Sequence, residues 1–468
     1  RIRIHSTDDR ATITAQSANL QAKEVDITAG NANLNGRISR HTDRGKAKVT
    51  HQNGVQSRDH QSGSSESYQA TRVQTDQFNV NVGGKLNISG ADIQAKNSNI
   101  LGGNVHLGAE KTVNLREHSK NQSKGSWYRN EQESNRVETT HRTTIAGDSV
   151  NIEATKGKVT TEGAKVSAKT TAIYGEQGVN LRGAKATTTQ TARAEFKNET
   201  ARLKTGLSSQ DSSVQHYTAT ELTTKQDLIL GGKGDLYLNG VVANVDGTLL
   251  AKNSGSLSFG SERSSESYNL SDDMRFWGGL AGSKTVGTGR SAETVHGADI
   301  TVKGDTTLDA SRGVHISGSR VVTGGNGVVK GNAGALVIDS TQAKTTAVDY
   351  ARQGTIFDIT KARQSSYTHT STAKGSTLKS ESNLQLSTNK NVSIVGSTVQ
   401  SAGLLDIAAK SGIEVKGAAN HVRTESSKAG FSFAGGFDSL KTSFQHGHLT
   451  ANLNLDNNKG KTSVDADV

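Results

Sequence analysis

Proline and cysteine are both absent from the 468 residues of this chain. Because proline donates no hydrogen bond to a strand ladder, its absence suits a chain that consists almost entirely of paired strands. The absence of cysteine excludes disulfides, thiol nucleophiles and thiolate metal sites. Aromatic residues make up only 4% of the chain, so we do not expect a large compact core. No run of about 18 apolar residues occurs, so no membrane-spanning helix is expected either.

The chain does contain a fixed period. Strand-like segments of the form Leu-x-Leu return after 21 residues, so that Leu384-x-Leu386 is followed by Leu405-x-Ile407. Blocks of such segments return at intervals of 72, 78, 78 and 78 residues, with starts at Phe78, Val150, Leu228, Thr306 and Leu384. Fixed periods of this kind indicate a repeat architecture rather than a globule around a single pocket.

Each turn of 21 residues holds two or three short strands in which Leu, Ile and Val alternate with Thr, Asn and Ser. This pattern predicts an all-β fold, an elongated parallel β-helix with a super-repeat of 78 residues and β-hairpin inserts. Two coils in each of six blocks give a rod of about 60 Å. Glycines are expected to provide positive φ or close approach at its corners, at Gly90, Gly163, Gly318 and Gly396.

We expect one continuous solenoid over residues 1–468. The strand-rich blocks lie near residues 1–36, 78–115, 148–181, 227–259, 305–339 and 383–415. The long polar segments between them are predicted to form antiparallel hairpins or a flanking sheet, because loops of this length are uncommon without structure or function. The chain opens at Arg1 inside the strand pattern and ends inside the next repeat, so we expect a fragment of a longer protein.

The charge balance is basic but mixed, with 55 Lys and Arg against 44 Asp and Glu. This balance could attract the protein to anionic surfaces such as lipopolysaccharide, polysaccharide or DNA. The basic residues alternate with acidic ones, however, and no sustained aromatic interleaving of the kind that stacks nucleotides is present. A soluble surface of mixed charge is therefore the simpler interpretation, and no specific nucleic-acid partner is expected.

One block carries a family resemblance. The segment Leu384–Ala418, followed by a Ser- and Glu-rich stretch and by Ala429–Gly436, resembles the haemagglutinin repeats of large two-partner-secreted exoproteins. These include filamentous haemagglutinins and the toxins of contact-dependent growth inhibition, and the alternation of strand-rich blocks with polar inserts is most similar to their second repeat region. The resemblance extends over essentially the whole chain.

The resemblance implies a right-handed coil, a Gram-negative source and export through an outer-membrane partner transporter. It places the parent protein in the secreted or cell-surface class, with a toxin domain C-terminal to the repeats if the parent is a contact-dependent inhibition effector. In those effectors the second repeat region is associated with delivering the toxin across the outer membrane of the target cell. In the adhesins it forms part of a fibre or of its precursor.

No enzyme, cofactor or metal site is predicted. The glycines Gly231–Gly234 lack the Gly-Lys-Ser/Thr ending and the helix of a phosphate-binding loop. His446 and His448 share a strand face, but spacing specifies no third metal ligand. The strand faces carry Thr, Asn and Ser rather than clustered acids or bases, which disfavours a β-helical polysaccharide lyase.

Aromatic and large apolar residues in the polar inserts are the candidate contact residues. Such groups either mark a contact with a partner or membrane, or pack the insert against the rod to cover an unpaired sheet edge. We favour packing, and the uncharged segment that begins at Phe276 is the best candidate for a membrane contact. The candidate residues are Trp127, Tyr128, Phe276, Trp277, Leu280, Phe431 and Phe433.

Two functions follow from these features. The first is a structural and delivery segment of a contact-dependent inhibition effector, whose inserts engage the target outer membrane or a receptor. The second is the shaft of a filamentous haemagglutinin-type adhesin that displays hairpins to glycans on host or neighbouring cells. Vesicle binding by the purified chain favours the first, and glycan binding without vesicle binding favours the second.

Overall fold

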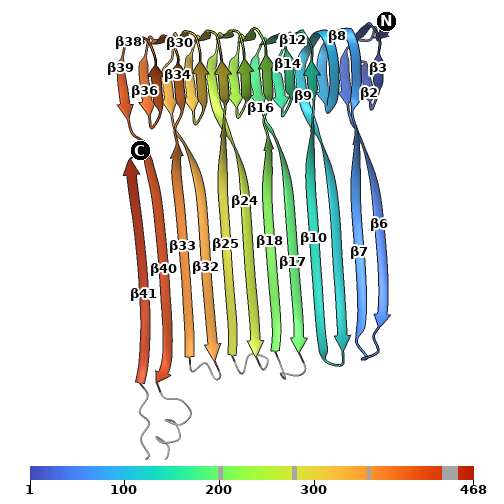
Figure 1. Cartoon of the computed structure of the whole chain (residues 1–468), viewed down its shortest axis with the longest axis vertical. Coiled ribbons are helices and arrows are strands. Elements are labelled where there is room, and N and C mark those ends of the chain that lie inside the picture. The colour runs from blue at the N-terminus through green and yellow to red at the C-terminus, as the bar shows by residue number, and fades with distance from the viewer. Residues whose placement is uncertain (199–203, 277–281, 356–359, 435–451, 468) are drawn as a thin grey trace, which may run out of the picture.

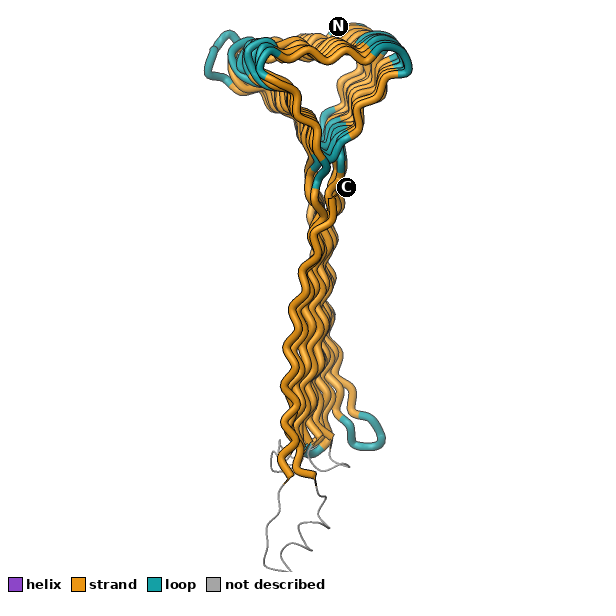
Figure 2. Tube along the Cα trace, turned by 90° about the vertical axis from the view of Figure 1, so that its left-hand side faces the viewer, coloured by secondary structure: helices purple, strands orange, loops and turns teal. Residues whose placement is uncertain are grey.

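The computed structural model describes residues 1–468 except 199–203, 277–281, 356–359, 435–451 and 468. The chain forms an elongated parallel β-helix from which long β-hairpins project on one side, as the sequence predicts (Figure 1). The coil is triangular in cross-section, with one parallel ladder along each side (Figure 2). No helix in the described chain is long and apolar enough to cross a lipid bilayer.

In the described chain the first two ladders each stack twelve strand segments, which equals the number of coils predicted from the sequence. The long strands β8 and β9 continue around the corners of the triangle, so each of them contributes to all three ladders. The first ladder contains β1 (Ile2–His5), β4 (Glu24–Ala29), β8 (Thr71–Ser89), β9 (Ala91–Lys124), β12 (Ser149–Ala154), β15 (Thr170–Gly175), β20 (Leu228–Gly232), β23 (Leu249–Asn253), β27 (Thr306–Ala310), β30 (Gly327–Gly331), β35 (Leu384–Thr388) and β38 (Leu405–Ala409). The second contains β2 (Thr12–Gln16), β5 (Asn31–Asn35), β8, β9, β13 (Val159–Glu162), β16 (Gly178–Arg182), β21 (Asp235–Asn239), β24 (Ser256–Phe276), β28 (Gly313–Ser317), β31 (Leu336–Asp339), β36 (Asn391–Val395) and β39 (Gly412–Lys416). The third contains β3 (Asn19–Gln21), β8, β9, β11 (Thr144–Ala146), β14 (Lys165–Ala168), β19 (Glu221–Thr224), β22 (Val242–Val245), β26 (Asp299–Val302), β29 (Arg320–Thr323), β34 (Thr377–Ser380) and β37 (Thr398–Ser401).

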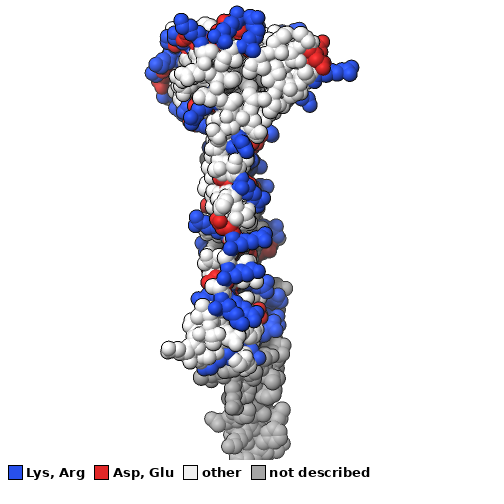
Figure 3. Space-filling view, turned by 90° about the vertical axis from the view of Figure 1, so that its right-hand side faces the viewer, with Lys and Arg blue, Asp and Glu red and all other residues white. Residues whose placement is uncertain are grey.

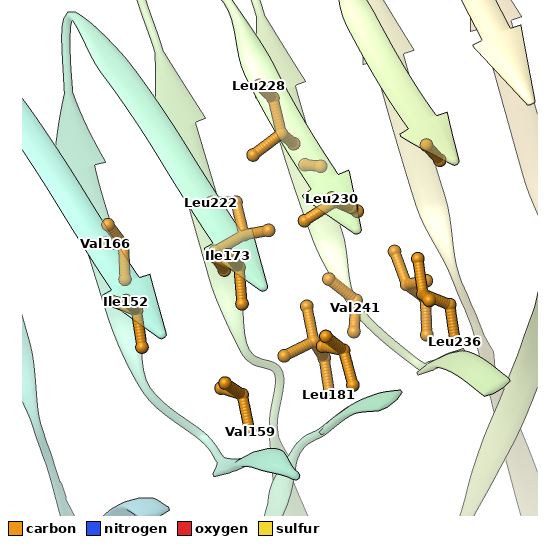
Figure 4. Close-up of a cluster of buried hydrophobic side chains, with 14 of the residues drawn as sticks. Ile152, Val159, Val166, Ile173, Leu181, Leu222, Leu228, Leu230, Leu236 and Val241 are labelled. Atoms are coloured by element: carbon orange, nitrogen blue, oxygen red, sulfur yellow. The ribbon is translucent and has the colours of Figure 1, made fainter. Parts of the chain in front are cut away.

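The core is a set of apolar columns inside the triangle. In one of them Ile152, Ile173 and Leu230 stack on successive coils, and all three are almost completely buried (Figure 4). Each such side chain removed from water contributes about 1.5–3 kcal/mol. Because the alternation within each strand points Leu, Ile and Val inward in every coil, the same residues that define the period also hold the rod together.

One corner of the triangle has two alternating forms. In every second coil it is a tight turn, and the predicted glycines Gly90, Gly163, Gly318 and Gly396 adopt φ values of 53–70° there. The sequence reading missed Gly240, which has a φ of 60° at the same place. Ser17 occupies this position in the first coil, and it is the one non-glycine residue with positive φ in the described chain.

In the remaining coils the same corner opens into a hairpin, and the hairpins pair with one another into a single antiparallel sheet. The coil resumes directly after each hairpin, so the second pair of coils lies at residues 71–108, earlier than the block drawn from the sequence at 78–115. In order across the sheet the strands are β6 (Arg37–Thr50), β7 (Gln56–Gln69), the end of β9, β10 (Trp127–Arg142), β17 (Ala184–Asn198), β18 (Lys204–Thr218), the end of β24, β25 (Gly282–Gly297), β32 (Thr341–Thr355), β33 (Thr360–Lys374), β40 (Ala419–Ala434) and β41 (Asn452–Asp467).

Candidate functional site

The hairpin sheet is a single layer with solvent on both faces (Figure 2). Its strands are 14–16 residues long where they are separate elements, so they carry their far ends about 50 Å from the coil. We call these far ends the distal rim, and its described residues include Lys124, Trp127, Tyr128, Phe196, Lys204, Met274 and Phe276.

Aromatic residues hold the base of the sheet on the corner glycines. The hydroxyl of Tyr217 donates to the carbonyl oxygen of Gly240 at 2.8 Å, and its ring stacks on His296 of the neighbouring hairpin at a centroid distance of 4.4 Å. Tyr68 bonds the carbonyl of Gly90 and stacks on the next hairpin in the same way. Burial, assisted by Glu110 and Asp92, raises the pKa of Tyr68 to about 12. The bases of the first and third hairpins are thereby fixed to rigid corners.

Carboxylate and amide side chains close the gap where two hairpins separate near the base. Glu66 Oε2 accepts a hydrogen bond from the backbone N–H of Val113 at 2.7 Å, and Glu138 Oε2 accepts one from Thr187 at 2.9 Å. Burial opposes ionisation of Glu138, but the bond from Thr187 and the nearby Arg136 lower its pKa overall. These bonds satisfy backbone donors where the strand ladder stops.

The central part of the distal rim combines aromatic rings with a cation. Phe196 lies over Gly206 on the opposite strand, where a Cβ atom would come within 2.4 Å of the ring. The ammonium of Lys204 lies 5.6 Å from the centroid of Phe276 and 6.0 Å from that of Phe196. Phe276 remains 38% exposed. The rim therefore presents apolar surface together with positive charge.

Trp127 and Tyr128 begin β10 immediately after the turn of the second hairpin. The hydroxyl of Tyr128 donates to Glu195 Oε1 of the third hairpin at 3.0 Å, and this bond, with burial, raises the pKa of Tyr128. Both rings are partly exposed. They extend the aromatic part of the rim across the second and third hairpins.

The preference for packing against the rod is wrong for Trp127, Tyr128 and Phe276, because a whole strand length separates them from the coil. Trp277 and Leu280 lie outside the described residues. Phe431 and Phe433 lie in β40, where the backbone is described but these side chains are not. The part of the aromatic set that the structure describes is thus brought to one edge of the sheet.

The sequence reading did not single out Phe196 and Lys204. For Phe196 the sequence does contain a signal. Residues 196 and 206 lie at equal distances on either side of the centre of their polar insert, and residues 276 and 282 do so in the following insert. This symmetry places each phenylalanine opposite a glycine near the tip of a hairpin. Lys204 had no comparable signal.

The edge strand β6 is strongly basic, and Figure 3 views the sheet from this side, with Lys and Arg side chains along its length. Residues 39–50 of β6 are all exposed. Charged residues on an edge strand oppose unwanted strand pairing. The basic residues are Arg37, Arg40, Arg44, Lys46 and Lys48.

The described ranges hold no group of three His, Asp or Glu residues placed to ligate a metal ion. His446 and His448 lie outside the described residues. Hydrogen bonds occupy the histidines near the base; His141 Nε2, for example, lies 2.9 Å from Thr112 Oγ1.

Comparison with known proteins agrees with this architecture. The hemagglutinin repeat matches residues 123–275 and 357–467, which is more than half of the chain. The chain belongs to the hemagglutinin-repeat family. No solved structure matches it.

Two curated relatives are both named hemolysin. The protein from Proteus mirabilis is 27% identical over 291 residues, which cover 62% of this chain and 18% of the relative. The protein from Serratia marcescens is 26% identical over 351 residues, which cover 74% of this chain and 22% of the relative. The chain therefore spans about a fifth of the length of these relatives.

Proposed function

We propose that this hemagglutinin-repeat chain is the segment of a large secreted exoprotein that presents a row of hairpin tips to a lipid membrane. The coil acts as a rigid support, and the distal rim makes the contact. The observation that carries this proposal is the position of Phe196, Phe276 and Trp127, which stand about 50 Å from the coil with a lysine between two of them.

The chemistry of the rim suits the boundary between water and lipid. Aromatic side chains with a polar atom, such as Trp127 and Tyr128, favour the level of lipid headgroups. Lysine next to an aromatic ring adds attraction to anionic lipid while its stem covers apolar surface. The name hemolysin of the two relatives also points to a membrane as the target of proteins that contain such repeats.

In its finer form the proposal follows the family resemblance. The parent protein is exported through an outer-membrane partner transporter and remains at the cell surface, and its repeats engage the outer membrane or a receptor of a neighbouring cell. It acts as a contact-dependent growth inhibition effector with a C-terminal toxin, and the repeat segment itself has no enzymatic role. The alternative is the shaft of an adhesin, whose tips bind glycans.

A flotation assay with vesicles of Gram-negative outer-membrane lipids tests the proposal. We expect the purified chain to float and Phe276→Ser to weaken binding by about 10-fold or more, since burying a Phe side chain is worth about 1.5–3 kcal/mol. Tyr237→Ser is the matched control, because Tyr237 is 37% exposed but lies on the coil.

Two results contradict the proposal. If both variants float like the parent chain, the rim does not carry the contact. If the chain never floats but binds outer-membrane glycans, the adhesin function replaces the membrane function.

A Trp277→Phe variant leaves Trp127 as the single tryptophan, and a blue shift of its emission with vesicles would place the rim in the lipid.

A further inference from the structure

Two arginines face each other near the distal rim of the fifth hairpin. Arg352 of β32 and Arg363 of β33 are direct partners in the antiparallel ladder, so their Cβ atoms lie about 5 Å apart on the same face of the sheet. Both side chains are exposed. Like charges in this arrangement destabilise a strand pair, so a structural role does not explain them.

Arg275 and Arg423, which lie on the same face nearby, have carboxylate partners, whereas Arg352 and Arg363 have none among the described residues. Arg275 pairs with Asp273 at 3.3 Å on the preceding hairpin, and Arg423 bonds Glu425 on the following one. No ion pair joins Arg352 or Arg363 to a carboxylate in the part of the chain that the structure describes. Two permanent positive charges are therefore left without an anion.

The two guanidinium groups border an open groove of about 650 Å³. Ser365 and Ser427, with short side chains, lie on the same face one alternation further from the rim and bring hydroxyls to the groove. Tyr350 lines one side of the groove, where its ring lies over Gly287 of the neighbouring strand and its hydroxyl donates to Ser271 Oγ at 3.1 Å. The groove therefore has room for a ligand of moderate size between cations and hydroxyl donors. Its lining residues are Thr285, Tyr350, Ala351, Arg352, Arg363, Gln364, Ser365, Ser427 and Ala429.

This combination matches a phosphate group. A pair of guanidinium forks binds phosphate oxygens through bidentate, charge-assisted hydrogen bonds, and serine hydroxyls complete the set of donors. We propose that Arg352 and Arg363 form a binding site for the phosphorylated headgroup of a membrane lipid. The inference rests on the proposed function, because it takes the ligand from the membrane that the rim contacts.

The depth of the site agrees with this ligand. Arg352 lies three residues before the end of β32, and Arg363 lies three residues after the start of β33. This spacing sets the arginines about 10 Å behind the tip. Along the paired strands Phe196 lies one residue and Phe276 three residues nearer the rim than Arg352. Rim aromatics at the boundary of the hydrocarbon would therefore leave Arg352 about 3–10 Å above that boundary, at the depth of a headgroup layer about 5–8 Å thick.

The experiment compares flotation with phosphatidylcholine vesicles and with vesicles that also contain phosphatidic acid, whose headgroup is a phosphate monoester. We expect phosphatidic acid to strengthen binding of the parent chain at least 10-fold and the double variant Arg352→Gln/Arg363→Gln to lose that gain. The control is Lys48→Gln/Arg58→Gln, which removes another pair of opposed cations at the same distance from the rim. Circular dichroism checks that both variants fold.

The outcomes separate the site from the proposed function. Equal losses in the two double variants would mean that unspecific charge is responsible and would overturn the site. Binding to vesicles that is insensitive to phosphatidic acid would overturn the site but keep the membrane function. Titration with inorganic phosphate by calorimetry forms the third arm: heat of binding that depends on the two arginines, without any flotation, would overturn the lipid as the source and the membrane function with it.

Discussion

Replacing Gly240 by alanine should detach the third hairpin from the coil. Gly240 has a φ of 60° at the tight corner, a conformation that costs a residue with a Cβ atom about 1–2 kcal/mol. The new Cβ would also come within 2.2 Å of the Tyr217 hydroxyl, so the tyrosine must leave. Loss of its hydrogen bond and of its stacking on His296 costs about 1 kcal/mol each. We therefore expect local stability to fall by about 3 kcal/mol.

Hydrogen exchange followed by mass spectrometry measures this loss locally. A change of about 3 kcal/mol accelerates exchange through local opening roughly 100-fold, and peptides from the bases of β18 and β25 should show it. Gly45→Ala is the control, because its Cβ would meet no atom within 4 Å. Exchange at Gly240→Ala that matches the control would refute the role of the corner.

The opposite substitution in the first coil sharpens the test. Ser17 has a φ of 54° where the equivalent corners use glycine. Ser17→Gly should remove the strain of about 1–2 kcal/mol, partly offset by about 0.5–1 kcal/mol of added freedom in the unfolded chain. A modest slowing of exchange around residues 12–21 is the expected sign, and faster exchange would contradict the strain argument.

Three further predictions concern the core, pH and charge. Leu238→Ala should destabilise the coil by about 2–5 kcal/mol in urea unfolding because Leu238 is 1% exposed, whereas Ile229→Ala, at a site that is 46% exposed, should change it by less than about 1 kcal/mol. Burial, followed by Lys374, lowers the pKa of His296, so the unfolded chain binds a proton more readily. The neutral form of His296 therefore contributes to the free energy of unfolding above about pH 6.5, and this contribution should be lost as the pH drops below that value. The His296→Phe variant should show a weaker pH dependence of its urea midpoint. Arg363→Gln should raise the stability of its hairpin by about 0.2–1 kcal/mol, measured as slower hydrogen exchange, since it removes a like-charge pair.

The coil could be predicted from the sequence because one face of every coil strand is buried. A buried face forces strict alternation, so Leu384 and Leu386 point inward and their partners Leu405 and Ile407 follow 21 residues later. The corner glycines could be predicted for the same reason, since a tight turn at fixed spacing demands positive φ. Gly240 was not identified as a corner glycine because it is followed by valine, whereas the other corner glycines are followed by alanine or serine.

The sequence predicts antiparallel hairpins or a flanking sheet over the polar segments, and the structure has both, but the register in which the hairpins pair could not be predicted in this way. Both faces of the sheet meet solvent, so neither face demands apolar residues and the register leaves no mark in the sequence. The pairing of β18 with β24 aligns Ser213 with Ser267 and Ser209 with Ser271, which any polar segment could imitate. The ladder is held mainly by backbone hydrogen bonds, and these are independent of residue type. For the same reason the aromatic residues were assigned to the coil rather than to the distal rim.

The length of the super-repeat has a geometric explanation. Neighbouring strands lie about 4.8 Å apart in both parallel and antiparallel ladders. Two coils advance the rod by two such spacings, and one hairpin adds two strands to the sheet, so one hairpin for every two coils keeps the sheet and the rod in step. A hairpin on every coil would crowd the sheet, and one on every third coil would leave its edges unpaired. The sheet that carries the distal rim is therefore set by the period of the coil, and the rim can lengthen only by whole super-repeats.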